Sequence, residues 1–205
     1  MSFFIGETLT MPKQLILDLF ENHMIKFGEF TLKSGKSSYI YADIRGAISY
    51  PKIFREICNE YYKLMHGLKY DHICGVPYSA LTFASGIAYE HQIPMLLKRK
   101  EAKNYGTKKL LEGVFTSGQT CLVIEDVVTT GSSFLETIQA LEDAGLKTTD
   151  LCTLIDRNQG GRELLTNKGY NLHSIMDLKQ IIEVLFDAQK ITLDDKNKAI
   201  QCMSN

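Results

Sequence analysis

One segment near the middle of the chain constrains both the fold and the chemistry more than any other. Residues 121–133 read Cys-Leu-Val-Ile-Glu-Asp-Val-Val-Thr-Thr-Gly-Ser-Ser, so an apolar run ends in two carboxylates. A loop of small hydroxyl residues around Gly131 follows, and a helical pattern begins directly after it. The apolar run predicts a buried strand. The loop predicts an anion site, because free N–H groups and the helix dipole point at it.

The two acids, Glu125 and Asp126, limit what the anion can be. Carboxylates repel an anion, but they accept hydrogen bonds from hydroxyl groups. A phosphorylated sugar therefore satisfies both halves of the segment. The alternative is a buried strand followed by an ordinary capped turn. Adjacent acids at a buried strand end are costly without a partner, which favours the sugar phosphate.

Composition and charge exclude several other classes of protein. The chain has 205 residues, 44% of them hydrophobic and 23% charged, which suits one globular domain with a small subdomain. A net charge of -1 gives no basis for binding nucleic acid or a membrane surface. Five scattered cysteines without a CxxC pair are typical of reduced thiols. Without a signal-peptide pattern or a run of about 20 apolar residues, we expect a cytoplasmic protein.

The N-terminal quarter predicts a small subdomain in front of a larger core. The expected elements are a helix at 13–25, strands at 27–32 and 39–44 around a turn, and a second helix at 51–66. We expect the first helix and the hairpin, about 12–45, to form a hood over the core. The core then covers about 51–190 of a single domain that spans 1–205.

From residue 72 onward, short apolar strands alternate with helical patterns. The strands are expected at 72–76, 94–97, 120–124, 151–155 and 172–176, and the helices at 80–91, 133–144 and 162–168, with one more capped by Asp177. This alternation predicts an α/β fold with a doubly wound, mostly parallel sheet flanked by helices. Such sheets bind ligands beyond the C-terminal ends of their strands, where Glu125 and Asp126 are expected. The polar tail beyond Lys190 fits either a helix or a disordered segment.

A second chemical feature is the strongly cationic segment 98–113. Its part 98–109 carries six basic residues around the single acid Glu101, and these are Lys98, Arg99, Lys100, Lys103, Lys108 and Lys109. Long charged loops inside compact α/β domains are uncommon and often functional. Beside a sugar-phosphate site, this one is suited to pyrophosphate. The alternative is a solvated surface loop.

Taken together, these segments resemble a known enzyme family. Residues 121–133 resemble the 5-phosphoribosyl-1-pyrophosphate (PRPP) signature of type I phosphoribosyltransferases. Four further segments, 30–38, 75–78, 99–107 and 155–161, look like those of orotate phosphoribosyltransferases, in the same order along the chain. Competing signatures are missing, because the sequence has no Gly-x-x-x-x-Gly-Lys-Ser/Thr, GxGxxG or HExxH pattern.

The resemblance implies a role for individual residues. Those implied to bind PRPP are Lys33, Tyr78, Ser79, Arg99, Lys100, Lys103, Tyr105, Glu125, Asp126, Val127, Val128, Thr129, Thr130, Gly131, Ser132 and Ser133. Those implied to bind orotate are Ile40, Tyr41, Thr129 and Arg157. Lys103 is the leading catalytic cation, with Lys100 and Arg99 beside it. The chain departs from many bacterial members at Ser79, where they carry a lysine that contacts pyrophosphate.

The implied reaction joins orotate to PRPP and gives orotidine 5-monophosphate and pyrophosphate, a step of de novo pyrimidine biosynthesis. Mg²⁺ is the implied cofactor, held by phosphate and water oxygens with no direct protein ligand assigned. The family further implies a homodimer in which the segment 98–113 reaches the neighbouring site. Two alternatives stay open: a phosphoribosyltransferase for another base, and a non-catalytic regulator that senses PRPP.

Overall fold

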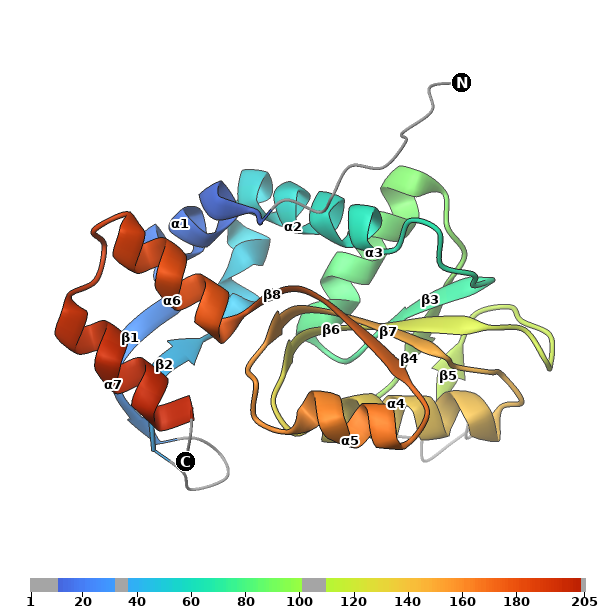
Figure 1. The fold of residues 1–205 in the computed structure, drawn as a ribbon. Coiled ribbons are helices and arrows are strands. Elements are labelled where there is room, and N and C mark those ends of the chain that lie inside the picture. The colour runs from blue at the N-terminus through green and yellow to red at the C-terminus, as the bar shows by residue number, and fades with distance from the viewer. Residues whose placement is uncertain (1–10, 32–36, 101–109, 204–205) are drawn as a thin grey trace.

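The core of the molecule is a six-stranded, mostly parallel sheet (Figure 1). The computed structural model describes residues 11–31, 37–100 and 110–203. The strands lie in the order β5 (Leu111–Glu112), β4 (Met95–Lys98), β3 (His72–Gly75), β6 (Cys121–Val128), β7 (Asp150–Asp156) and β8 (Asn171–Asp177). Only β5 runs antiparallel to its neighbour among these strands. Every residue of β3, and nearly every residue of β7, is buried, as expected for strands covered on both faces.

Helices cover both faces of this sheet and confirm the predicted doubly wound fold. In Figure 1, α2 (Pro51–Leu64) and α3 (Ser79–His91) lie on one face, and α4 (Ser132–Asp143) and α5 (Gly161–Asn167) lie on the other. Their apolar side chains join those of the strands in one continuous core. None of the helices in the described part of the chain is both long and apolar enough to cross a membrane.

A smaller lobe stands beside the core and is built from both ends of the described chain (Figure 1). It holds α1 (Lys13–Glu21), the hairpin of β1 (Ile25–Thr31) and β2 (Ser37–Ala42), and the two C-terminal helices α6 (Leu178–Asp187) and α7 (Leu193–Met203). The tail that the sequence left open is therefore helical. It packs on β2, where the Tyr39 hydroxyl donates to the Asp195 carboxylate at 3.0 Å.

Two elements of this lobe end earlier than their sequence patterns predict. The first helix stops at Glu21 rather than Ile25, because the chain turns at His23, which has a φ of 59°, and Ile25 opens β1. The second strand of the hairpin ends at Ala42. Ile44 instead begins the 3₁₀ helix η1 (Ile44–Ser49), which Asp43 caps by accepting from the backbone N–H of Arg45.

Two corrections affect the site directly. The central strand β6 runs on to Val128 instead of ending at Ile124, because β7 continues to pair with it as far as Asp156. The two acids therefore lie within the strand, and the loop begins only at Thr129. The segment 98–113 is also not wholly a loop, since Leu111 and Glu112 form β5 at the edge of the sheet against β4.

Candidate active site

A cavity of about 670 Å³ lies where β6 and β7 end and the hairpin faces them. It gathers most of the residues implied to bind the two substrates: Tyr41, Glu125, Asp126, Val127, Val128, Thr129, Thr130, Gly131, Ser132, Ser133 and Arg157. Segments of the hairpin, the central strand and the corner after β7 thus converge on one space. This is the edge of the sheet at which parallel α/β folds bind ligands.

The loop of the cavity has the geometry of an anion site. Gly131 is the N-cap of α4 and has a φ of 82°, a conformation that favours glycine. A Cβ at this position would also lie 3.1 Å from the side chain of Leu165, so the loop is packed closely against α5. The hydroxyls of Thr130 and Ser132 lie 3.3 Å apart at the start of the helix. Hydroxyls and helical N–H groups together suit a phosphate.

The two adjacent acids have different environments. Glu125 is only 7% exposed, and burial followed by the neighbouring Asp126 raises its pKa well above the usual value. The Tyr61 hydroxyl fixes this position by donating to the Glu125 backbone carbonyl at 2.6 Å. Asp126 is more accessible, and its carboxylate accepts from the Val127 N–H at 3.0 Å. Asp126 is therefore the better placed of the two to accept from sugar hydroxyls.

Arg157 is a buried cation at the other end of the cavity. It is 4% exposed, and its Nη2 donates to the Ser38 hydroxyl at 3.1 Å and to the Ile40 carbonyl at 3.4 Å. Its Nε donates to the Gln159 amide at 3.2 Å. All of these partners are neutral, and burial lowers the arginine pKa. Among the described residues no acid pairs with it, so an anionic ligand is the partner that this charge lacks.

The structure refines the implied roles of two apolar residues. Ile40 is buried and meets Arg157 through its backbone carbonyl, so its side chain does not line the cavity. Tyr41, the next residue of β2, does line it. Val128 belongs to the cavity lining but is buried, and its side chain is part of the hydrophobic core.

The remaining predicted residues lie outside the cavity or outside the described part of the chain. Arg99 binds Glu112 of β5 through Nε at 2.7 Å and Nη2 at 2.6 Å. Lys100 Nζ lies 5.4 Å from the centre of the Tyr78 ring, which is 66% exposed. Ser79 opens α3, with its Oγ buried and without a hydrogen-bond partner in the described structure. Lys33, Lys103 and Tyr105, which the sequence also predicts to bind PRPP, lie outside the described residues.

The cavity contains a second arginine, which was not predicted from the sequence. Arg45 of η1 lines it together with Asp43, and the two form a bidentate pair, Nε to Oδ1 at 2.7 Å and Nη2 to Oδ2 at 2.6 Å. This contact lowers the Asp43 pKa. Thr31 of β1 lines the cavity as well. The sequence feature that could have indicated this arginine is the pair of opposite charges, Asp43 and Arg45, directly after the strand that carries Tyr41.

The cavity combines a loop suited to phosphate, an accessible acid on the strand β6 that precedes this loop, and a buried arginine. These features are those of the class of phosphoribosyl-binding α/β proteins. The family model described as the phosphoribosyl transferase domain matches residues 50–175. Relatives narrow the class further. An orotate phosphoribosyltransferase of Chlamydia caviae is 38% identical over 187 residues, which cover 90% of each chain. The chain belongs to the orotate phosphoribosyltransferase family.

Longer relatives contain a similar stretch. A uridine 5'-monophosphate synthase of Bos taurus is 44% identical over 182 residues, which cover 88% of this chain and 38% of that relative. The chain therefore spans about two fifths of the length of such relatives. The structure of a UMP synthase of Leishmania donovani matches with a TM-score of 0.88 and 34% identity, over 96% of this chain and 43% of that one.

Proposed function

We propose that this chain transfers the 5-phosphoribosyl group from PRPP to orotate, which gives orotidine 5-monophosphate and pyrophosphate for pyrimidine synthesis. The observation that carries the proposal is the buried charge of Arg157, which has no acidic partner among the described residues and faces the same cavity as the loop at Gly131. Orotate is an acidic pyrimidine, so its negative charge supplies the missing partner. A neutral base would leave the arginine uncompensated, which counts against a transferase for another base.

The reaction displaces pyrophosphate from the anomeric carbon of the ribose by a pyrimidine nitrogen. Negative charge grows on the leaving pyrophosphate while the sugar gains positive character, so catalysis depends on position and electrostatics. In our proposal the loop at Thr129–Ser133 holds the 5-phosphate and Asp126 accepts from the ribose hydroxyls. Arg99, Lys100 and Lys103 stabilise the leaving group, for which Arg99 must exchange Glu112 for a phosphate oxygen.

The residues present are compatible with Mg²⁺ as the cofactor. The described part of the chain holds no group of three side chains of the types that ligate metals, and Glu125 is buried with a raised pKa. Asp126 is the one acid of the pair that is well placed beside such an ion. This suits Mg²⁺, which keeps several water ligands and binds phosphate oxygens. When bound, it would supply charge neutralisation on the pyrophosphate.

The expected homodimer and cytoplasmic location belong to the same proposal. Arg99 and Lys100 do not line the cavity formed by their own chain. Their position supports the expectation that the segment 98–113 completes the site of a second copy. A subunit-mixing experiment with two inactive variants tests this arrangement directly.

The decisive experiment measures orotate consumption by the purified chain with PRPP and Mg²⁺. We expect turnover with orotate, much less with adenine or guanine, and none without PRPP. An Asp126→Asn variant is the matched control for the ribose site, because it removes one charge and keeps the shape. Binding of PRPP without turnover of any base would instead support a regulator, and would overturn the proposal.

A further inference from the structure

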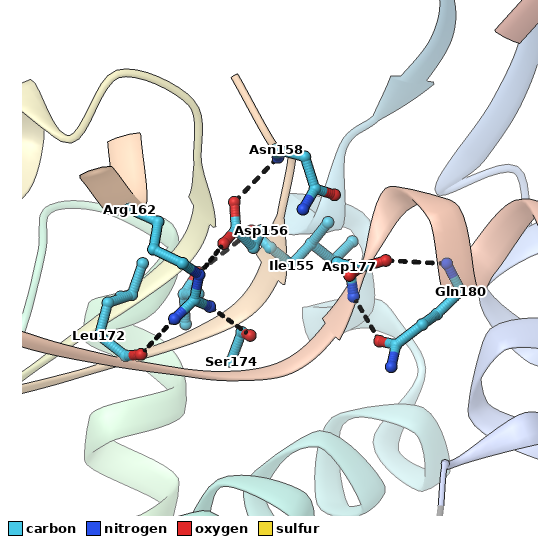
Figure 2. Close-up of polar contacts among 9 residues, drawn as sticks. Ile155, Asp156, Asn158, Arg162, Leu172, Ser174, Asp177 and Gln180 are labelled. Atoms are coloured by element: carbon cyan, nitrogen blue, oxygen red, sulfur yellow. Dashed lines mark hydrogen bonds and ion pairs between the residues drawn. The ribbon is translucent and has the colours of Figure 1, made fainter. Parts of the chain in front are cut away.

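A single carboxylate holds the chain on both sides of Arg157. Asp156 is the last residue of β7 and is 1% exposed. Its Oδ1 accepts from the backbone N–H of Asn158 at 2.9 Å, and its Oδ2 accepts from Nε of Arg162 at 2.8 Å (Figure 2). The residues that precede and follow Arg157 are therefore fixed by the same group.

Arg162 connects three elements at this corner. It lies on α5, binds Asp156 of β7, and donates from Nη1 to the Leu172 carbonyl at 2.6 Å and from Nη2 to the Ser174 hydroxyl at 2.8 Å (Figure 2). Both of the last two residues belong to β8. Unlike Arg157, this arginine has its charge matched by an acid, and each of its three side-chain nitrogens donates within the protein. It is thus suited to support rather than to ligand binding.

The geometry of the corner determines where the Arg157 guanidinium points. The Arg157 N–H donates to the Val128 carbonyl at 3.0 Å, and Asn158 then turns the chain with a φ of 53°. The side chain can in this way reach Ser38 on the hairpin. A residue that must meet a ligand in one orientation depends on such supporting contacts, because small displacements weaken the interaction steeply.

The same corner contacts the phosphate loop. A Cβ at Gly161, the first residue of α5, would lie 2.6 Å from the Thr129 carbonyl, so only glycine allows this approach. Gly161, which directly precedes Arg162 in α5, therefore packs on the loop. A displacement of this corner would move Arg157 before other residues of the cavity, because Asp156 and Asn158 are its direct neighbours in the chain.

We propose that Asp156 and Arg162 are positioning residues for pyrimidine recognition, which act through Arg157 without touching the substrate. This inference rests on the proposed function and deepens it. The competing explanation is an ion pair that only stabilises the fold. Buried ion pairs are often replaceable at little cost when both partners are removed together, so stability alone does not separate the two explanations.

The test compares Arg162→Met, Asp156→Asn, the double variant and Arg162→Lys in steady-state kinetics with each substrate varied in turn. We expect KM for orotate to rise about tenfold in Arg162→Met, the size of effect expected when charge-assisted hydrogen bonds are lost. KM for PRPP should change by less than about threefold, because the loop keeps its own contacts. Arg162→Lys should recover part of the orotate affinity, since it can still donate to Asp156.

The double variant separates a shared role from two independent ones. If both residues act through Arg157, it should lose no more orotate affinity than the worse single variant. Arg55→Met, an exposed arginine on α2, is the matched control and should leave both KM values unchanged. Thermal melting of each variant identifies those that fold. If Arg162→Met does not fold, the comparison is made with Arg162→Lys and Asp156→Asn.

Three results would overturn the positioning role. These are an unchanged KM for orotate in the folded variants, equal increases in KM for both substrates, and additive losses in the double variant. Wild-type turnover is the reference throughout. Its absence would remove the proposed function and this inference together, whereas normal wild-type turnover with unaffected variants would remove only the inference.

Discussion

Arg157 and Arg99 are both proposed to meet an anionic substrate, and the structure holds these two cations in different ways. Arg157 lies at the end of the cavity and is buried, and its partners in the described part of the chain are all neutral. Arg99 lies on the cationic segment, partly exposed, and already paired with Glu112. The first is held in place before the ligand arrives, while the second must give up a partner to bind one.

The difference follows from the cost of burying charge. A buried guanidinium without a carboxylate is unfavourable in the free protein, and an anionic ligand relieves that cost on binding. An exposed ion pair is weak, about 0–1 kcal/mol, so it can exchange partners easily. The pyrimidine end should therefore provide selectivity, and the cationic segment should provide transient stabilisation of the leaving group.

The largest expected effect is on the cationic segment. Lys103→Ala should reduce turnover by more than about 10²-fold, because it removes a charge that acts on the developing pyrophosphate. The melting temperature should not change. Steady-state kinetics of the purified variant test this, and turnover close to that of the wild type would contradict the assignment of Lys103.

A mixing experiment then asks in which subunit Lys103 works. Inactive Lys103→Ala and Asp126→Ala proteins are combined under conditions that allow subunit exchange. If the segment reaches the neighbouring site, heterodimers hold one site with both lesions and one with neither, so about a quarter of all sites should recover. No recovery after confirmed exchange would place the segment in its own subunit, whereas a failure to form dimers would make the chain a monomer.

At the cavity end, Arg157→Met should lower kcat/KM for orotate by about 10- to 100-fold, the range for hydrogen bonds to a charged group. Because the variant removes a buried unpaired charge, its melting temperature should be equal to or higher than that of the wild type. Parallel kinetic and melting measurements check both parts. Destabilisation without loss of orotate affinity would mean that Arg157 is structural.

Substitutions of Asp126 and Glu125 should have different effects, as those of Arg157 and Arg99 should. Asp126→Asn should weaken PRPP binding about tenfold, because the accessible carboxylate is assigned to the ribose hydroxyls. Orotate binding should change less. Calorimetric titration with each ligand measures both affinities, and equal losses for the two would argue against the sugar-binding role of Asp126.

The effect of Glu125 should instead appear in the pH dependence of the protein's stability. Its pKa in the folded protein is raised well above 4.5. At a pH between 4.5 and this raised pKa, Glu125 is therefore protonated in the native state and ionised in the unfolded chain. The contribution of Glu125 to stability is therefore fully present below about pH 4.5 and is lost as pH rises through the folded pKa. Glu125→Gln should remove this decline and melt higher than the wild type at neutral pH, by about 2–4 °C for each kcal/mol recovered. Melting curves with parallel pH dependence would contradict this account.

The smallest expected effect comes from freeing Arg99. Glu112→Gln removes the partner of Arg99, so KM for PRPP should fall by less than about fivefold, in line with the low free energy of an exposed pair. The effect should shrink further at high salt. A large change in either direction would mean that the pair with Glu112 is more than a temporary resting contact.

The sequence by itself determined the features that depend on neighbours along the chain. The apolar run from Cys121 predicted a buried strand, and the loop at Gly131 predicted a helix start. Asp177 was predicted to be a helix cap, and it accepts a hydrogen bond from the backbone N–H of Gln180 (Figure 2). These signals are local because periodicity and capping involve residues within a few positions of one another. The alternation of such elements was enough to predict the fold class.

Only the tertiary structure decided which charges are paired and which are free. Arg157 meets Ser38, which lies 119 positions away in the chain, while Asp156 next to it is taken by Arg162. Arg45 enters the cavity because a 3₁₀ helix replaces the expected strand end, and Asp195 reaches Tyr39 because the last helix folds back onto the hairpin. No local pattern encodes these contacts, because the partner of a charge is selected by packing between distant segments.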